Sequence, residues 1–223
     1  MNVVIFGASG MVGQGVLREC LLDPEVTSVL SAGRSPSGSR DTKLKDLVVP
    51  NVFDLSAVKG QLQGFDACFF CLGTTAVGKS EEEYTRLTYD LTMSVANTVA
   101  PLNPGMTFVY VSGASTDSTE KGSAMWARVK GRTENELLRM PFKAAYMFRP
   151  GIIQPLDGIK PKTTLYRVIY DVLSPLAPLL KRAFPAKITT TRNVGRAMIS
   201  VARHGYATPI LEIADIERAA VSG

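Results

Sequence analysis

Three glycines at a regular spacing follow the first apolar segment of the chain. Val3–Phe6 leads directly into Gly7-Ala8-Ser9-Gly10-Met11-Val12-Gly13, and an amphipathic stretch continues to about Leu22. An apolar strand, a glycine-rich turn and a helix in this order predict backbone N–H groups that hold the phosphates of a dinucleotide. The first glycine allows the sharp turn, the second allows the diphosphate to approach, and the third allows the helix to pack closely. The residues expected to contact the cofactor are Gly7, Ser9, Gly10, Met11, Val12 and Gly13.

The bulk composition suits a single α/β domain. The chain has 223 residues, of which 45% are hydrophobic and 20% are charged, as in ordinary globular proteins. It begins with a core strand that leaves no room for a signal peptide, and no apolar run is long enough to span a bilayer. We therefore expect a cytoplasmic protein without stable membrane insertion.

The net charge of +5 is modest, and the basic residues are scattered along the chain. Nucleic-acid binding would require a contiguous basic face with interleaved aromatic residues, which the sequence lacks. We therefore expect no nucleic-acid partner. A mildly basic chain does suit a polyanionic small molecule.

Cys68 and Cys71 have the spacing C-x-x-C, but they lie in the apolar segment 66–72, which is expected to be a buried strand. Side chains three positions apart on a strand point to opposite faces of the sheet. Both thiols are therefore interpreted as packing residues, and we expect no metal site. The single histidine, His204, is interpreted as a solvated residue near a helix end.

Apolar segments of strand length alternate with helical segments over most of the chain. This alternation predicts a Rossmann-type, doubly wound parallel sheet with helices on both faces, formed as one NAD(P)-binding domain over residues 1–223. Strands are expected near residues 2–6, 27–32, 46–49, 66–72, 107–112, 144–148 and 209–213. Helices are expected near residues 11–22, 56–62, 80–100, 123–139, 164–182 and 192–203, with Pro101 ending the third of them.

Residues 150–190 are expected to form a small, irregular region on the substrate side. Six prolines break this stretch into short pieces, and an apolar stripe runs from Leu165 to Leu180. The stripe fits a helix packed on the main core, and it fits equally a lid over a substrate pocket at residues 151–190. A helix on a membrane surface would need more basic residues than this stretch has.

Arg34 follows the second expected strand, at the position that faces the adenosine ribose in a dinucleotide-binding fold. A carboxylate here would accept hydrogen bonds from the 2′-hydroxyl of NAD, whereas a guanidinium can bind a 2′-phosphate. The sequence therefore predicts NADP(H), with a preference of roughly 10- to 100-fold over NAD(H). A merely solvated Arg34 is the alternative. Ser35 is expected to contribute to the site, and Lys43 is a further candidate.

Two further segments reach the same edge of the expected sheet. Asp54 and Leu55 follow the third strand, where a short carboxylate can accept a hydrogen bond from the adenine amino group. Leu72, Gly73 and Thr74 end the fourth strand, where a dinucleotide would cross the sheet. Ligands of open α/β sheets bind beyond the carboxyl ends of the strands, so we expect all five residues to contact the cofactor.

Several motifs together resemble those of a known family. They are the turn in its G-x-x-G-x-x-G form, Gly33-Arg34, Asp54-Leu55, Ser112 at a strand end, Lys130-Gly131 in the next helix and Phe148-Arg149-Pro150-Gly151. They resemble the short-chain dehydrogenases over almost the whole chain. The likeness is to the atypical branch, near the Tat-interacting-protein-like oxidoreductases and more distantly to the NmrA-like group.

The resemblance implies an active site with a Tyr-x-x-x-Lys pair and a serine. By position, Lys130 matches the lysine, which also holds the nicotinamide ribose, and Ser112 matches the serine, with Ser115 as the alternative. Trp126 stands at the tyrosine position. An indole N–H donates a hydrogen bond but does not titrate usefully, so the loss should lower the rate by about 10²–10⁴.

Three functions remain open at this point. The cofactor motifs and Lys130 favour an NADP(H)-dependent oxidoreductase that acts on a carbonyl or enone of a small apolar molecule. Trp126 favours a non-catalytic NADPH-binding protein with a regulatory or structural role. Epimerase or dehydratase chemistry on a nucleotide sugar would need the missing tyrosine, and the spacing selects none of Tyr84, Tyr89 and Tyr166 as its replacement. The substrate and the oligomeric state stay open, and the resemblance is compatible with a homodimer.

Overall fold

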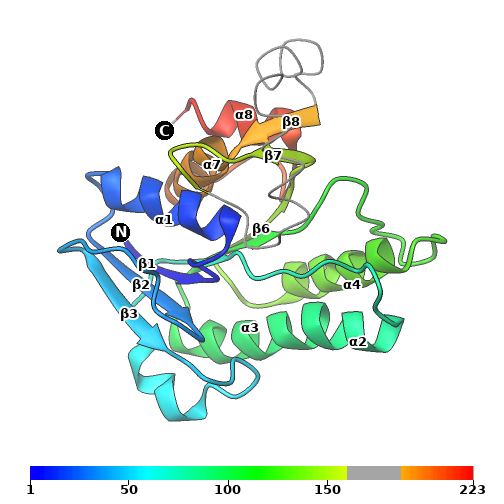
Figure 1. The fold of residues 1–223 in the computed structure, drawn as a ribbon, viewed down its shortest axis with the longest axis horizontal. Coiled ribbons are helices and arrows are strands. Elements are labelled where there is room, and N and C mark those ends of the chain that lie inside the picture. The colour runs from blue at the N-terminus through cyan, green and yellow to red at the C-terminus, as the bar shows by residue number, and fades with distance from the viewer. Residues whose placement is uncertain (160–186, 223) are drawn as a thin grey trace.

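A computed structural model describes residues 1–159 and 187–222 of the chain. Seven parallel strands form one sheet in the order β3-β2-β1-β4-β5-β6-β9 (Figure 1). The order reverses between β1 and β4, as in a Rossmann-type doubly wound sheet, so the expected fold class is confirmed. The strands are β1 (Asn2–Phe6), β2 (Ser28–Gly33), β3 (Leu44–Val48), β4 (Ala67–Phe70), β5 (Thr107–Val111), β6 (Ala144–Arg149) and β9 (Ile210–Glu212).

Helices cover both faces of the sheet (Figure 1). One face carries α1 (Met11–Leu22), α7 (Thr191–His204) and α8 (Ile213–Ala219), and the other carries α3 (Leu91–Leu102) and α4 (Met125–Arg139). A short helix α2 (Glu81–Thr85) and a π-helical turn η2 (Arg86–Asp90) lead into α3, and a 3-10 helix η1 (Ser56–Gln61) follows β3.

The central strand β1 fills the core on both sides of the sheet. Val3 and Ile5 pack in the layer that includes α1 and α7, and Val4 and Phe6 pack in the layer that includes α3. All four side chains are completely buried. A strand covered on both faces is apolar at every position, which explains the unbroken apolar run that opens the chain.

The two cysteines of the C-x-x-C segment divide between the same layers. Cys68 packs in the α3 layer, and Cys71 packs against the α1 and α7 layer. Their predicted placement on opposite faces of the sheet is confirmed. His204 is exposed at the end of α7, as the sequence predicts.

Several element boundaries differ from the sequence-based expectation. The strand pair β7 (Ile152–Gln154) and β8 (Ile188–Thr190) is not predicted, because three-residue strands give no periodic signal. The last strand ends at Glu212 rather than 213, because Glu212 and Asp215 form a capping box that begins α8. Pro101 does not end α3, which continues to Leu102.

Part of the expected architecture lies outside the described residues. This applies to the helix at 164–182, to Tyr166 and to most of the substrate-side region at 151–190. The division of the chain into a single domain stays a prediction. Within the two described ranges, no helix combines the length and the apolar content that a membrane crossing requires.

Candidate functional site

The glycine turn joins β1 to α1 at the carboxyl edge of the sheet. Gly7 has a φ of +91°, and a Cβ there would lie 2.9 Å from the carbonyl carbon of Cys71. A Cβ on Gly13 would lie 2.0 Å from the carbonyl oxygen of Gly7. Only glycine at these two positions lets α1 begin this close to the end of the strand.

The amino end of α1 can bind an anion. Gly10 is the N-cap residue, no described side chain caps this end, and the first turn has no acidic residue. The first N–H groups are therefore available to a ligand, and the helix dipole adds positive potential. Gly10, Met11 and Val12 line the adjacent cavity. Ser9 does not line it, and its carbonyl accepts a hydrogen bond from Gln14 Nε2 at 3.1 Å.

Two cavities lie at this edge of the sheet and share the wall formed by Leu72–Thr74. The lysine cavity has a volume of about 540 Å³ and is lined by Gly10–Val12, Cys71–Thr75, Val111–Gly113, Lys130, Pro150, Gly151 and Ile153. The arginine cavity has a volume of about 520 Å³ and is lined by Arg34, Pro50–Phe53, Leu72–Thr74, Arg86, Leu87 and Leu91. The pair forms a site beyond β1, β4 and β5, where ligands of such sheets bind.

Arg34 is exposed at the end of β2 and lines the arginine cavity. Ser35 is exposed beside it and does not contribute to the lining. The segment after β3 contributes Phe53 to the wall, whereas Leu55 is buried in the core and Asp54 does not reach the cavity. Asp54 is exposed and accepts hydrogen bonds from Ser56, which lower its pKa.

The expectation that Lys43 assists Arg34 is wrong. Lys43 directly precedes β3, so it lies at the amino edge of the sheet, opposite the site. Its Nζ donates hydrogen bonds to the carbonyl oxygens of Leu21 at 3.1 Å and Asp23 at 2.7 Å. Lys43 therefore binds the end of α1 and has no role at the cavity.

Lys130 extends from α4 into the lining of the lysine cavity and is half-buried. Its Nζ lies 5.5 Å from the centroid of the Tyr110 ring. Burial lowers the pKa of Lys130 to about 8, and the charge of Glu134, one turn further along α4, offsets part of this effect. Near neutral pH the amine holds a proton that it releases more readily than an ordinary lysine does.

Glu134 itself belongs to a buried ion pair. It is completely buried, and its two oxygens accept hydrogen bonds from Arg149 Nε at 3.1 and 3.2 Å. Arg149 also donates to Ser118 Oγ and, at 3.4 Å, to Glu212. Arg149 already compensates the charge of Glu134. The carboxylate therefore offsets only part of the decrease that burial causes in the pKa of Lys130.

Ser112 and Lys130 line the same cavity, although they lie on different elements. Ser112 Oγ lies 3.0 Å from Thr116 Oγ1, and Thr116 donates its own hydrogen to the Gly113 carbonyl at 2.8 Å. The Ser112 hydroxyl is therefore the donor in the pair. Ser115, the alternative serine, is exposed with a φ of +67° and does not line the cavity.

Gly131 fixes how closely α4 approaches the segment that follows Ser112. A Cβ on Gly131 would lie 1.8 Å from the carbonyl oxygen of Asp117. Close packing therefore explains why a glycine follows Lys130. It also sets the position of the lysine relative to the end of β5.

No tyrosine among the described residues lines either cavity. Trp126 lies on α4 one turn before Lys130, is partly buried and does not reach the lining. Tyr84 and Tyr110 are buried, which raises their pKa, and Tyr89 packs under the guanidinium of Arg132. The described part of the chain therefore places no tyrosine hydroxyl at the candidate site.

Several residues of the site carry no signal in the sequence. Arg86 lines the arginine cavity, and Cys71 and Ile153 line the lysine cavity. Pro150 and Gly151, which also line the lysine cavity, belong to the motif Phe148-Arg149-Pro150-Gly151, but the sequence predicts no role for them. Arg86 lies in a helical segment without a motif around it, so no sequence signal distinguishes it from a surface arginine.

Comparison with curated proteins gives a clear relative. The chain is 30% identical over 159 residues to "Protein fmp52, mitochondrial" of Emericella nidulans, and the alignment covers 68% of the chain and 66% of that protein, slightly less than two thirds of its length. Relatives from Debaryomyces hansenii and Candida albicans are also named as mitochondrial. These names overturn the expectation of a cytoplasmic protein. No family model matches the chain.

Solved structures support the fold. A short-chain dehydrogenase family protein from Francisella tularensis superposes with a TM-score of 0.67 at 16% identity, over 95% of each chain. The Bordetella bronchiseptica enzyme WbmF, solved in complex with NAD+, superposes with a TM-score of 0.62 at 14% identity, over 99% of this chain and 77% of that one. At these identities the likeness establishes the fold and leaves chemistry to be argued from the site.

Proposed function

We propose that the chain, which is similar to the Fmp52 proteins and has the fold of short-chain dehydrogenase family proteins, is an NADP(H)-dependent oxidoreductase that reduces a carbonyl of a small, apolar molecule. One observation carries the proposal. A cavity with an arginine and a cavity with a serine and a lysine share one wall at the end of β4. A dinucleotide needs these two adjoining spaces, one for its adenosine half and one for its nicotinamide half.

The residues of the site fit this cofactor. Gly7 and Gly13 let α1 begin close to the end of β1, and the uncapped start of α1 offers N–H groups to a diphosphate. Arg34 would bind the 2′-phosphate, and Lys130 would hold the nicotinamide ribose. Asp54 and Leu55, the other adenosine-side candidates, would need to move to make contact.

Ser112 and Lys130 would act on the substrate carbonyl. NADPH, when bound, supplies a hydride for the carbonyl carbon. Ser112 would turn its hydroxyl hydrogen from Thr116 to the substrate oxygen and thereby orient and polarise the carbonyl. Lys130 holds a proton on Nζ below about pH 8 and would deliver it to that oxygen, directly or through a water molecule. The product is the corresponding alcohol.

Calorimetric titration of the full chain with NADPH and NADH tests the cofactor assignment. We expect NADPH to bind about 10- to 100-fold more tightly than NADH, and we expect Arg34→Ala to remove most of this preference. Arg40→Ala is a matched control, because Arg40 is exposed in the same loop and lines neither cavity. If neither dinucleotide binds, the oxidoreductase proposal fails.

A second function, NADPH binding without catalysis, is favoured by Trp126 and by the lack of a tyrosine in the lining among the described residues. Turnover of NADPH by the natural chain against a panel of carbonyl compounds separates the two functions. If the natural chain binds NADPH but turns over none of these compounds, the binding function stands. Turnover by the natural chain excludes the binding-only function.

The relatives also suggest a subcellular location. The names of the Fmp52 proteins favour a mitochondrial location for this chain. Fractionation of cells that express the full-length protein tests this, and recovery outside the mitochondrial fraction contradicts it.

A further inference from the structure

A second arginine, Arg86, lines the arginine cavity besides Arg34. The two residues come from different layers of the fold, because Arg34 directly follows β2 and Arg86 begins the π turn η2. No aspartate or glutamate of residues 1–159 and 187–222 lines this cavity. Two cations that share a cavity without a carboxylate favour an anionic ligand.

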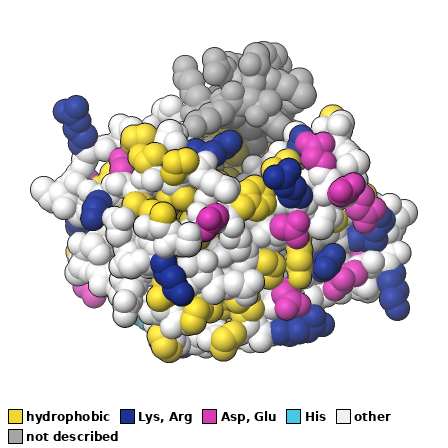
Figure 2. Space-filling model, turned by 90° about the horizontal axis from the view of Figure 1, so that it is seen from below, with side chains coloured by type: hydrophobic (Ala, Val, Ile, Leu, Met, Phe, Trp, Pro, Cys, Tyr) yellow, Lys and Arg dark blue, Asp and Glu magenta, His cyan; other side chains and the backbone are white. Residues whose placement is uncertain are grey.

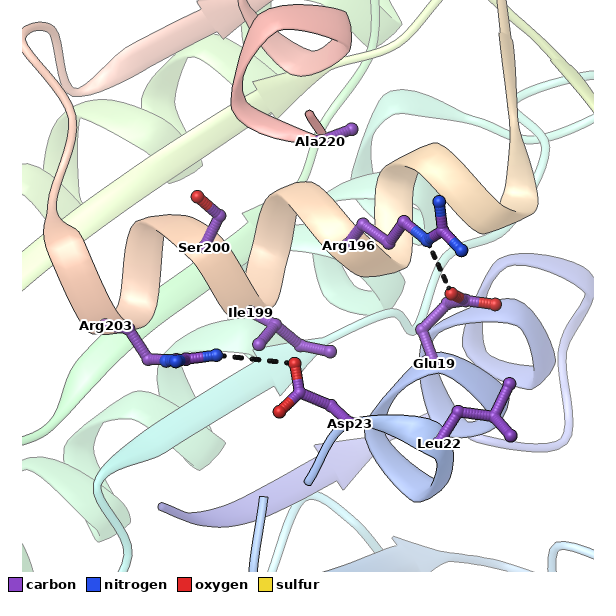
Figure 3. Close-up of a pocket in the computed structure, with 8 residues that line it drawn as sticks. All are labelled: Glu19, Leu22, Asp23, Arg196, Ile199, Ser200, Arg203 and Ala220. Carbon is purple, nitrogen blue, oxygen red and sulfur yellow. Dashed lines mark hydrogen bonds and ion pairs between the residues drawn. The ribbon is translucent and has the colours of Figure 1, made fainter. Parts of the chain in front are cut away.

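Most other arginines of the described ranges are paired with carboxylates. The basic side chains in Figure 2 lie interspersed with acidic ones. In the pocket between α1, α7 and α8, Arg196 donates to Glu19 at 2.9 Å and Arg203 to Asp23 at 3.4 Å (Figure 3). Neither Arg34 nor Arg86 has an ion pair within the described ranges. The arginine cavity thus differs from that pocket, whose charges are compensated within the protein.

The π turn accounts for the position of Arg86. The N–H of Leu91 donates to the carbonyl of Arg86, five residues earlier. This hydrogen bond brings residues 86 and 91 to one side of the helical segment, and π turns recur at functional sites. Leu87 and Leu91 line the cavity with Arg86, so the turn presents one cationic and two apolar side chains to the same space.

The exposed side chain of Arg86 contacts an aromatic ring of the cavity wall. Its Cζ lies 5.4 Å from the centroid of the Phe53 ring, which also lines the cavity. A cation–π contact of this kind limits the conformations of a long side chain, so less entropy is lost when the side chain binds an anion. The apolar side chains beside it suit the adenine ring.

We propose that Arg86 is a second specificity-determining residue, which binds the 2′-phosphate of the adenosine together with Arg34. This inference rests on the proposed NADP(H) function and assigns to the same site a residue that is far from Arg34 in sequence. A 2′-phosphate carries close to two negative charges near neutral pH, which two guanidinium groups can neutralise.

The test compares adenosine-half probes with whole cofactors, using calorimetry on the full chain. Arg86→Ala is expected to weaken binding of NADPH and of 2′,5′-ADP by about 10- to 100-fold. Binding of NADH and of 5′-AMP is expected to change by less than about threefold, since they lack the 2′-phosphate. Arg86→Lys keeps the charge and should recover part of the loss. The matched control is Arg132→Ala, because Arg132 lies over a tyrosine ring in the same way, at 4.1 Å from Tyr89, and lines neither cavity.

The outcomes separate this inference from the proposed function. An equal loss for NADPH and NADH would mean that Arg86 contacts the adenine or supports Phe53, and the inference fails while the cofactor assignment stands. Unchanged NADPH binding in Arg86→Ala, with the preference lost only in Arg34→Ala, also overturns the inference alone. If the natural chain binds neither NADPH nor 2′,5′-ADP, both proposals fail. Thermal unfolding of each variant shows that the fold is retained.

Discussion

The glycine turn and the Ser112–Lys130 side of the lysine cavity, which would hold the diphosphate and the nicotinamide half of one ligand, are built from different parts of the chain. The turn is formed by consecutive residues, Gly7–Gly13, and it offers backbone N–H groups. The lysine cavity combines Ser112 after β5, Lys130 on α4 and Gly151 after β6. The first is a matter of local backbone geometry, and the second depends on tertiary packing and on buried charge.

Because of this difference, the turn and the lysine cavity should respond to different substitutions. The turn contains no titratable side chain, so a change in charge elsewhere leaves it intact. The lysine cavity depends on the buried pair Glu134–Arg149, which lies one helical turn from Lys130. Variants that disturb one half while sparing the other therefore test whether the two halves are independent.

The largest effect is expected from Arg149→Met, which leaves Glu134 buried without its main partner. Removal of one member of a buried ion pair costs about 3–5 kcal/mol of unfolding free energy. Urea unfolding near neutral pH measures the loss. The double variant Glu134→Met with Arg149→Met leaves no unpaired charge and should be markedly more stable than the single variant. A single variant as stable as the natural protein would show that the pair carries little of the stability of this half.

A smaller and more informative effect is expected from alanine at two glycines. Gly13→Ala places a Cβ 2.0 Å from the Gly7 carbonyl oxygen, and Gly131→Ala places one 1.8 Å from that of Asp117. Each should cost about 1–3 kcal/mol, because backbone has to move. Gly13→Ala should abolish NADPH binding, whereas Gly131→Ala should displace Lys130 and lower turnover while NADPH still binds.

Gly60→Ala is the matched control for both, since nothing lies within 4 Å of a Cβ at that position. Calorimetry with NADPH and urea unfolding of the three variants give the comparison. Equal losses of NADPH affinity in Gly13→Ala and Gly131→Ala would show that the two halves are not independent.

The sequence predicts the half of the site that is local in the chain. The glycine turn, Arg34 and the strand end at Leu72–Thr74 were identifiable because each follows directly on an apolar strand. The fold class follows from the same alternation of apolar and helical segments. Lys43 precedes the third strand with the expected boundary as well as with the observed one, so its place at the amino edge follows from chain order, and proximity to Arg34 in sequence does not bring it to the site.

The remaining features depend on packing that no local pattern contains. Arg86 reaches its cavity through a π turn, which has no sequence signature of its own. Leu55 turns into the core because the chain after β3 forms the 3-10 helix η1. Glu134 and Arg149 are fifteen residues apart and meet only when α4 packs beside β6. Such contacts emerge from the tertiary structure.

The pH dependence of the lysine cavity should differ from that of the turn. Burial lowers the pKa of Lys130 from 10.5 to about 8, so Nζ is charged below about pH 8 and neutral above it. If Lys130 supplies the proton, carbonyl reduction should be constant below about pH 8 and should fall about tenfold per pH unit above it. NADPH binding through the backbone of the turn should show no such break. An ordinary exposed lysine would place the break more than two pH units higher.

Lys130→Arg keeps a cation that stays protonated over this range, so the break near pH 8 should disappear even if the rate is lower. A break that persists in Lys130→Arg would assign it to another group.

Stability gives a second readout. The folded protein binds this proton less readily than the unfolded chain, so the natural protein should gain stability relative to Lys130→Met as the pH rises from about 8 to 10.5. Urea unfolding at several pH values measures this gain without a substrate, and its absence would show that Lys130 is solvated and that its charge plays no special part in the cavity.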